Sequence, residues 1–269
     1  MNYFNILLDW IFEFILGNAY PSNKIENLPV EDASSLDSRK GIVCCDIEDA
    51  TNIAVDDPIP SLPEYNSRFT WIIDNGHGKL QAGKRSPRFK LNGEMTQFFE
   101  YKFNRNVATH LMRMLDNANI DYVDLVPDVE HVGSFLEGRV QRINELKQDK
   151  LQILISIHSN AGPGNKHGWS EAHGIETWYD TDKERSIAAI FQKHLVSGLG
   201  LKNRKLKKNK QTKFYFFKML EIPVIYTETG FFNNKKEVKF LSKETTPFDT
   251  ALAHYKAICE IEGVEPFNS

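Results

Sequence analysis

The chain has 269 residues, of which 41% are hydrophobic and 26% charged, and this composition predicts one well-filled core plus appendages. A formal net charge of -3 provides no whole-molecule field that attracts nucleic acid, so we expect no nucleic-acid partner. The three cysteines, Cys44, Cys45 and Cys259, have neither the separation for a disulfide framework nor the paired spacing of a zinc–cysteine site.

The first 16 residues are almost entirely apolar, with one polar stripe at helical spacing: Asn2, Asn5, Asp9 and Glu13. We expect a helix whose apolar residues, within 3–16, pack on the same protein, on another subunit or on a membrane surface. Membrane contact ranks last because the acidic pair, Asp9 and Glu13, provides no attraction to anionic lipid. The segment lacks the positive start of a secretory signal, but Gly17 and Ala19 resemble a cleavage site, so a signal peptide stays an open alternative.

Residues 21–64 carry five prolines, many acids and little periodicity, which predicts a linker or a loosely docked segment. We therefore expect two parts. Residues 1–64 comprise the N-terminal helix and linker, and residues 65–269 comprise the catalytic domain.

After residue 64 strand and helix patterns alternate. Strands are expected at 69–73, 122–126, 152–157, 174–179 and 223–228, and helices at 96–118, 134–148, 183–198 and 248–260. This alternation predicts an α/β domain, with a mostly parallel central sheet and helices on both faces. In that architecture, sites gather at the carboxyl ends of the strands.

Two histidines follow apolar strand patterns in this way. His77 comes after the first strand, between two glycines that allow a tight turn, and His158 comes after the strand at 152–157. Either one alone is more simply a hydrogen-bonded loop histidine. At equivalent positions of one sheet, the pair favours a metal site, because neutral imidazole is the commonest zinc ligand.

A carboxylate ligand is expected from the helix at 96–118. Glu100 shares the core-facing stripe of that helix, where a carboxylate is costly to bury unless it is paired or bound to a metal. The alternative is a helix-start glutamate that is favoured by the helix dipole. Glu94 is a weaker candidate, because it follows Asn92 and Gly93 in what we expect to be a solvated turn.

Glu228 ends the apolar strand at 223–228 and so reaches the same edge of the sheet. A buried carboxylate next to an activated water is what a general base requires. Without the histidines, Glu228 would be interpreted as an ordinary strand-end residue.

Five segments in order resemble the motifs of the zinc amidase family known as Amidase_3. They begin at Ile73 (IDNGHG), Phe99 (FEYKFNR), Ser156 (SIHSNA), Gly174 (GIETWY) and Thr227 (TETGFFNN), and the resemblance covers about residues 68–245. The form with Gly83-Lys-Arg-Ser-Pro after the first motif is similar to the amidases of phage lysins and related bacterial enzymes. One departure is Asn75, which stands where proline commonly precedes Gly-His-Gly.

The resemblance implies the phosphorylase/hydrolase-like fold of zinc amidases and hydrolysis of the amide bond between N-acetylmuramic acid and L-alanine in peptidoglycan. Carried over to this sequence, it implies Zn²⁺ held by His77, Glu100 and His158, with Glu228 as the catalytic acid/base. Such an enzyme acts on the bacterial cell wall, in the periplasm or outside the cell, and a phage lysin would first be made in the cytoplasm.

Substrate contacts are expected from Glu176, which lies in a matched segment, and from Lys205 and Lys207. These lysines belong to a basic cluster over 202–213 that we interpret as a loop, either simply solvated or acting as a clamp for anionic groups of the wall. Glu176 is equally compatible with orienting a ligand or with a structural role.

Two other functions stay open at the level of sequence. A different zinc peptidoglycan peptidase would use the same metal and base on another bond. A non-catalytic wall-binding or structural protein would keep the fold without activity, although nothing physical then requires His77, Glu100, His158 and Glu228 together.

Overall fold

A computed structural model of the chain describes residues 65–79, 81–126, 135–146, 149–210 and 214–266. The helix and linker predicted for residues 1–64, and the self-association predicted through residues 3–16, lie outside the described residues. Within the described part, no helix is both long and apolar enough to cross a membrane.

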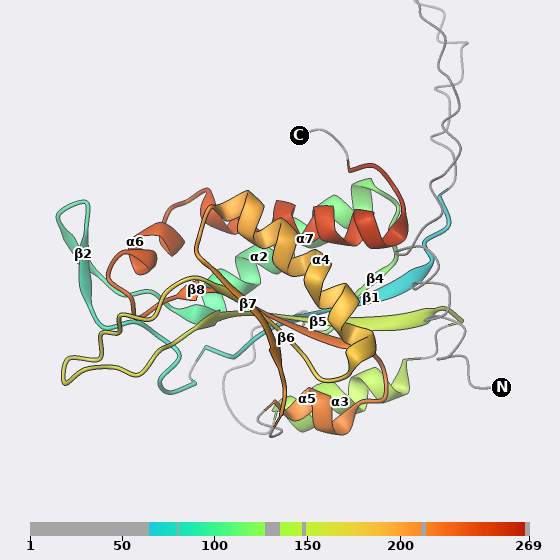
Figure 1. The fold of residues 1–269 in the computed structure, drawn as a ribbon, viewed down its shortest axis with the longest axis horizontal. Coiled ribbons are helices and arrows are strands. Elements are labelled where there is room, and N and C mark those ends of the chain that lie inside the picture. Colours follow the sequence, from blue (N-terminus) through green and yellow to red (C-terminus); the bar gives the residue numbers. More distant parts are fainter. Residues whose placement is uncertain (1–64, 80, 127–134, 147–148, 211–213, 267–269) are drawn as a thin grey trace, which may run out of the picture. The chain divides into compact units, whose positions relative to one another are not determined.

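The core of the fold is a six-stranded sheet (Figure 1). In spatial order its strands are β4 (Tyr122–Asp124), β1 (Phe69–Asn75), β5 (Leu151–Asn160), β8 (Val224–Phe231), β6 (Ile175–Tyr179) and β7 (Asn203–Lys208). All neighbouring pairs are parallel except β6 and β8, which are antiparallel. The prediction of a mostly parallel sheet is therefore confirmed.

Helices cover both faces of the sheet, as predicted (Figure 1). One layer contains α2 (Glu100–Asn117), α4 (Asp182–Leu199) and α7 (Thr246–Glu262), and the other contains α3 (Phe135–Glu145) and α5 (Tyr215–Met219). The short helix α6 (Glu237–Leu241) follows β8. Because both faces are covered, the central strands are buried nearly throughout, including all seven residues of β1 and all eight residues of β8.

Strand alternation decides which side chains share a face of the sheet. Ile72, Leu154 and Tyr226 pack in one buried cluster with Val140 of α3 and Phe216 of α5. Residues two positions further along the same strands therefore also point toward the layer of α3 and α5. This alternation brings the chemically important side chains of β1, β5 and β8 to one face at the carboxyl edge.

The helix predicted from residue 96 begins instead at Glu100, because a short hairpin precedes it. Its strands, β2 (Phe89–Leu91) and β3 (Glu94–Thr96), pair antiparallel. Asn92 and Gly93 form the turn, with φ values of 51° and 89°. Two consecutive positive φ values are the signature of the tight turns that match the twist of a hairpin.

The basic segment predicted as a loop is partly a strand. Residues 203–208 form β7, the edge strand of the main sheet, paired in parallel with β6. Apolar periodicity does not detect such a strand, because its side chains are mostly charged and only partly buried. Charged residues are well suited to an edge, since they oppose pairing with another chain.

Candidate active site

Three side chains from distant parts of the sequence converge at the carboxyl edge of the sheet. His77 follows β1, Glu100 is the first residue of α2, and His158 lies near the end of β5. His77 Nε2 is 3.1 Å from Glu100 Oε1, and His158 Nδ1 is 3.2 Å from the same oxygen. The possible ligand atoms of all three lie within 4.8 Å of one another, so the group has the composition and proximity to hold one metal ion.

Glu100 is buried, with 1% of its side chain exposed. Its Oε1 also accepts a hydrogen bond from the backbone N–H of Ser159, 3.1 Å away, whereas Oε2 has no hydrogen-bond partner among the described residues. Burial opposes ionisation of the carboxyl group, but the neighbouring His77 and His158 outweigh it and hold the pKa of Glu100 below its usual value. A buried carboxylate with an unused oxygen beside two imidazoles fits a metal ligand.

The sequence predicts that the two glycines flanking His77 adopt the backbone conformation of a tight turn, but the structure differs. His77 itself has a φ of 70°, in the left-handed region. Gly76 is needed for another reason, because a Cβ atom there would lie 2.1 Å from His158 Cε1. The glycine therefore makes room for the second imidazole rather than for the turn.

His158 is packed tightly on the face of α3 and α5. Its ring stacks against Tyr226 of β8 at 5.4 Å between centroids, and it meets the ring of His77 edge-on at 4.6 Å. Burial lowers the pKa of His158, an effect that the neighbouring Glu100 opposes. The neutral imidazole that burial favours is the form that binds metal.

Glu228 is the register partner of His158 on the adjacent strand β8. It is 8% exposed, and its Oε2 has no hydrogen-bond partner among the described residues. Burial raises the pKa of Glu228, the charge of Glu100 raises it further, and Lys84 opposes the shift. A buried carboxylate with a raised pKa is suited to take up and return a proton.

A cavity of about 330 Å³ unites these groups. Its lining contains all four residues predicted for chemistry: His77, Glu100, His158 and Glu228. It also contains Lys84, Arg139 and Tyr226, for which the sequence predicts no role in the site. No sequence signal marked Arg139 or Tyr226 as site residues, because each lies inside an ordinary helix or strand pattern.

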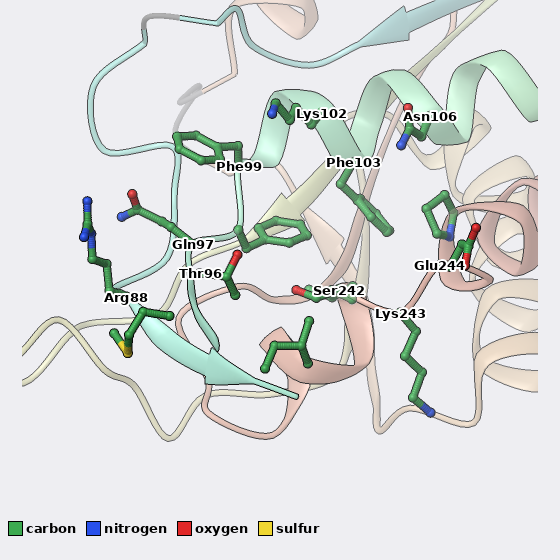
Figure 2. A pocket seen from close by; sticks show the side chains of 15 residues that line it. Arg88, Thr96, Gln97, Phe99, Lys102, Phe103, Asn106, Ser242, Lys243 and Glu244 are labelled. Atoms are coloured by element: carbon green, nitrogen blue, oxygen red, sulfur yellow. The ribbon is translucent and has the colours of Figure 1, made fainter. Parts of the chain in front are cut away.

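A larger cavity of about 660 Å³ lies beside the first turns of α2 (Figure 2). Figure 2 shows Lys102 and Phe103 of α2 and Ser242 and Lys243 of the segment after α6 around it. None of the four residues predicted for chemistry lines this cavity. We therefore locate the candidate active site in the smaller cavity.

The residues predicted to contact substrate lie outside the lining of the smaller cavity. Glu176 is buried and is the register partner of Glu228 on the neighbouring strand. Its carboxylate oxygens accept hydrogen bonds from Arg204 Nε at 2.6 Å and from Asn160 Nδ2 at 3.2 Å. Lys207 Nζ lies 4.0 Å from Glu176, and Lys205 is exposed on β7. Substrate binding by Glu176, Lys205 and Lys207 stays a prediction.

Glu94, the weaker ligand candidate, is exposed on β3 and is not a member of the metal-binding group. Its exposure agrees with the solvated turn expected for it.

An α/β sheet with two histidines and two glutamates gathered at its carboxyl edge has the residues that a metal-dependent hydrolase requires. The chain belongs to the N-acetylmuramoyl-L-alanine amidase family, whose sequence model matches residues 72–260. Members of this family are generally metal-dependent, and the His–Glu–His group is present here.

Individual proteins and one solved structure are also similar to this chain. The YqiI protein of Bacillus subtilis strain 168 is 29% identical over 65% of this chain and 76% of its own length. The endolysin of Bacillus phage SPP1 is 26% identical over 72% of this chain and 66% of its own length. The crystal structure of the N-acetylmuramoyl-L-alanine amidase of Clostridium difficile 630 is 26% identical, with a TM-score of 0.58 over 73% of this chain and 97% of that chain.

The predicted enzyme class and fold are thus confirmed. The protein is an N-acetylmuramoyl-L-alanine amidase whose substrate is peptidoglycan, and it acts on the bacterial cell wall.

Proposed function

We propose that this amidase is zinc-dependent and that His77, Glu100 and His158 hold the zinc ion. The observation that carries the proposal is the convergence of two imidazole nitrogens and one carboxylate oxygen within 4.8 Å, in a cavity that they share with Glu228. Two histidines and a glutamate form a known ligand set of catalytic zinc sites, in which a fourth position stays open for water or substrate. When bound there, zinc supplies Lewis-acid activation of a carbonyl group and of water.

Glu228 is the general base and then the general acid of the proposed reaction. Its carboxylate takes a proton from the water that attacks the lactyl carbonyl of N-acetylmuramic acid. The same proton passes to the nitrogen of L-alanine as the carbon–nitrogen bond breaks, which leaves a carboxylic acid on the sugar and a free amine on the peptide stem. The burial that raises the pKa of Glu228 makes the protonated form accessible for this second step.

The proposal predicts different defects for a ligand and for the base. Glu228→Gln keeps the shape of the side chain but cannot accept the proton, so we expect amidase turnover to fall by about 100-fold or more while one zinc per chain is retained. His158→Ala should lose both zinc and activity. Metal analysis of the purified full chain, with mass spectrometry of digested peptidoglycan, measures both quantities, because an amidase releases peptides that begin with L-alanine.

Two results would overturn the proposal. A wild-type protein that is active without zinc, after chelation and dialysis, excludes the metal. A Glu228→Gln variant that digests peptidoglycan at the wild-type rate excludes Glu228 as the base.

A further inference from the structure

A buried chain of polar side chains lies next to His158 and is not used in the proposed reaction. It consists of Ser156 on β5, Asp74 on β1 and Arg139 on α3, and these side chains are at most 1% exposed. His158 Nε2 is 3.0 Å from Ser156 Oγ, and the Ser156 hydroxyl donates to Asp74 Oδ2. Arg139 Nη1 donates to the other oxygen of the same carboxylate, Asp74 Oδ1, at 2.6 Å.

Strand pairing builds this chain. Asp74 and Ser156 are register partners on the parallel strands β1 and β5. His158 lies two residues beyond Ser156, so both side chains point to the same face of the sheet. The arrangement depends on the regular register of the two strands and not on a loop.

The directions of the hydrogen bonds determine which nitrogen of His158 carries the proton. The Asp74 carboxylate, paired with the Arg139 guanidinium, acts as an acceptor. Ser156 has a single hydroxyl hydrogen and donates it to Asp74, so its oxygen must accept from His158 Nε2–H. The proton therefore resides on Nε2, and the lone pair of Nδ1 faces Glu100 and His77.

Without this chain the opposite tautomer would be favoured. His158 Nδ1 lies 3.2 Å from Glu100 Oε1, and a proton on Nδ1 would form a hydrogen bond to that carboxylate. Such a proton would block the nitrogen that a metal ion needs. His77 has an equivalent constraint, since its Nδ1 donates to Gln81 Oε1 at 2.7 Å and leaves Nε2 facing the site.

We propose that Asp74 and Ser156, held by Arg139, form a positioning relay that keeps His158 in the Nε2–H tautomer and so sets the affinity for the metal. The inference rests on the proposed zinc site of His77, Glu100 and His158. Arg139 also reaches the backbone oxygens of Asn75 and His77, at 3.3 and 3.5 Å, so it ties the relay to the segment that carries the first imidazole.

Zinc affinity of the full chain, measured by competition with a chelator of known affinity, tests the relay. Ser156→Ala should bind zinc about 10- to 100-fold more weakly, which is the usual effect of removing a hydrogen-bond partner of a metal-binding histidine. Ser67→Ala is the matched control, because Ser67 is also a buried serine whose hydroxyl lies 3.0 Å from a carboxylate oxygen, Glu262 Oε1, but it precedes β1 and so lies at the opposite end of that strand from the site. We expect the Ser67→Ala variant to bind zinc as the wild type does.

A second pair of variants distinguishes the effect of the hydroxyl group at position 156 from the effect of side-chain shape. Ser156→Thr and Ser156→Val add the same bulk, but only threonine keeps the hydroxyl, so threonine should bind zinc more tightly than valine by a similar factor. Nitrogen-detected NMR of the histidine rings should show a proton on His158 Nε2 in the wild type and in the threonine variant. The signals of the ring nitrogens report the tautomer of His158 directly. If Ser156 had only a structural role, replacing it would not change this tautomer.

The outcomes separate the two proposals. If the wild type binds no zinc, the proposed metal site fails, and the relay fails with it. If the wild type binds zinc and Ser156→Ala binds it with the same affinity, only the relay is excluded. Equal zinc affinities of Ser156→Val and Ser156→Thr would exclude the relay as well. Equal weakening by Ser67→Ala would also exclude the relay, because a general loss of packing would then explain the weaker binding.

Discussion

Gly76 illustrates how one missing side chain shapes the site. A Cβ atom at this position would lie 2.1 to 2.5 Å from three atoms of the His158 ring, which is far closer than van der Waals contact allows. We expect Gly76→Ala to displace this imidazole and to weaken zinc binding by at least about tenfold, because small displacements of a ligand or its support carry penalties of this order. Chelator competition measures the change.

Gly138 provides the comparison for Gly76→Ala. It lies within α3, where a Cβ atom would meet nothing closer than 3.8 Å. Gly138→Ala should leave zinc binding unchanged and should stabilise the protein by up to about 1 kcal/mol, since alanine favours a helix. If both alanine variants bound zinc like the wild type, a side chain at position 76 would not displace the His158 ring, and the requirement for glycine there would be wrong.

At the scale of the element, α4 is attached to the sheet through its own N-terminal cap. Thr181 and Glu184 form a capping box, and Glu184 Oε2 accepts from the backbone N–H groups of Asp180 and Thr181. The other oxygen, Glu184 Oε1, accepts from the backbone N–H of Val224 at 3.0 Å. One buried carboxylate therefore caps α4 and also fixes the start of β8, the strand that carries Glu228.

Removing this carboxylate should be costly. Glu184→Ala leaves three backbone N–H groups without their acceptor, and we expect a loss of about 2 to 4 kcal/mol in the free energy of unfolding. Asp182→Ala, in the same turn, removes an exposed carboxylate that pairs with Lys208, and it should lower the stability much less because solvent screens such a pair. Urea denaturation of both variants measures the difference, and similar losses would contradict the role of Glu184.

The edge strand β7 carries the lysines predicted to contact anionic groups of the wall. If Lys205 and Lys207 contribute, replacing either with alanine should raise KM about two- to fivefold at low salt, and the effect should fade as salt screens the charges. Lys150 precedes β5, at the opposite end of that strand from His158, and Lys150→Ala is the control. Kinetics on peptidoglycan at two salt concentrations test this prediction. Unchanged KM values would mean that the two lysines are solvated edge residues that do not bind the substrate.

For the molecule as a whole, His254 links acid sensitivity to the packing of α7 on the sheet. Its Nδ1 donates to the Thr250 backbone oxygen at 2.8 Å, so its Nε2 accepts from the Thr227 hydroxyl of β8 at 2.9 Å. Burial lowers the pKa of His254 to about 4, from an ordinary value of 6.5. The ring is therefore neutral in the folded protein over the range in which the unfolded chain takes up a proton.

This difference predicts how stability depends on pH. The contribution of His254 is complete above about pH 6.5 and is lost as the pH falls toward 4, because the unfolded state binds more protons in that window. We expect a loss of about 2 kcal/mol between pH 7 and pH 5 from this residue. Urea denaturation at both values should show a smaller loss for His254→Gln, and equal losses in both proteins would exclude His254 as the source.

The local patterns of the chain determined much of this result. Apolar runs before His77, His158 and Glu228 predicted three strands, because strand periodicity is a property of neighbouring residues. The predicted ends were too early, since β5 continues to Asn160 and β8 to Phe231. Glu100 was found in the same way, as a carboxylate on a core-facing stripe. These local signals sufficed for the mostly parallel α/β class and for the four residues of the proposed chemistry.

Only the tertiary structure decided the features that depend on residues distant in the chain. The pairing of Asp74 with Ser156 needs the register of two strands, and the contact of Arg139 with Asp74 needs α3 to pack beneath them. The requirement for glycine at position 76 comes from a ring 82 residues away in the chain. β7 was missed for a related reason, because a charged edge strand is held by the backbone of its neighbour and its own side-chain pattern carries no apolar period.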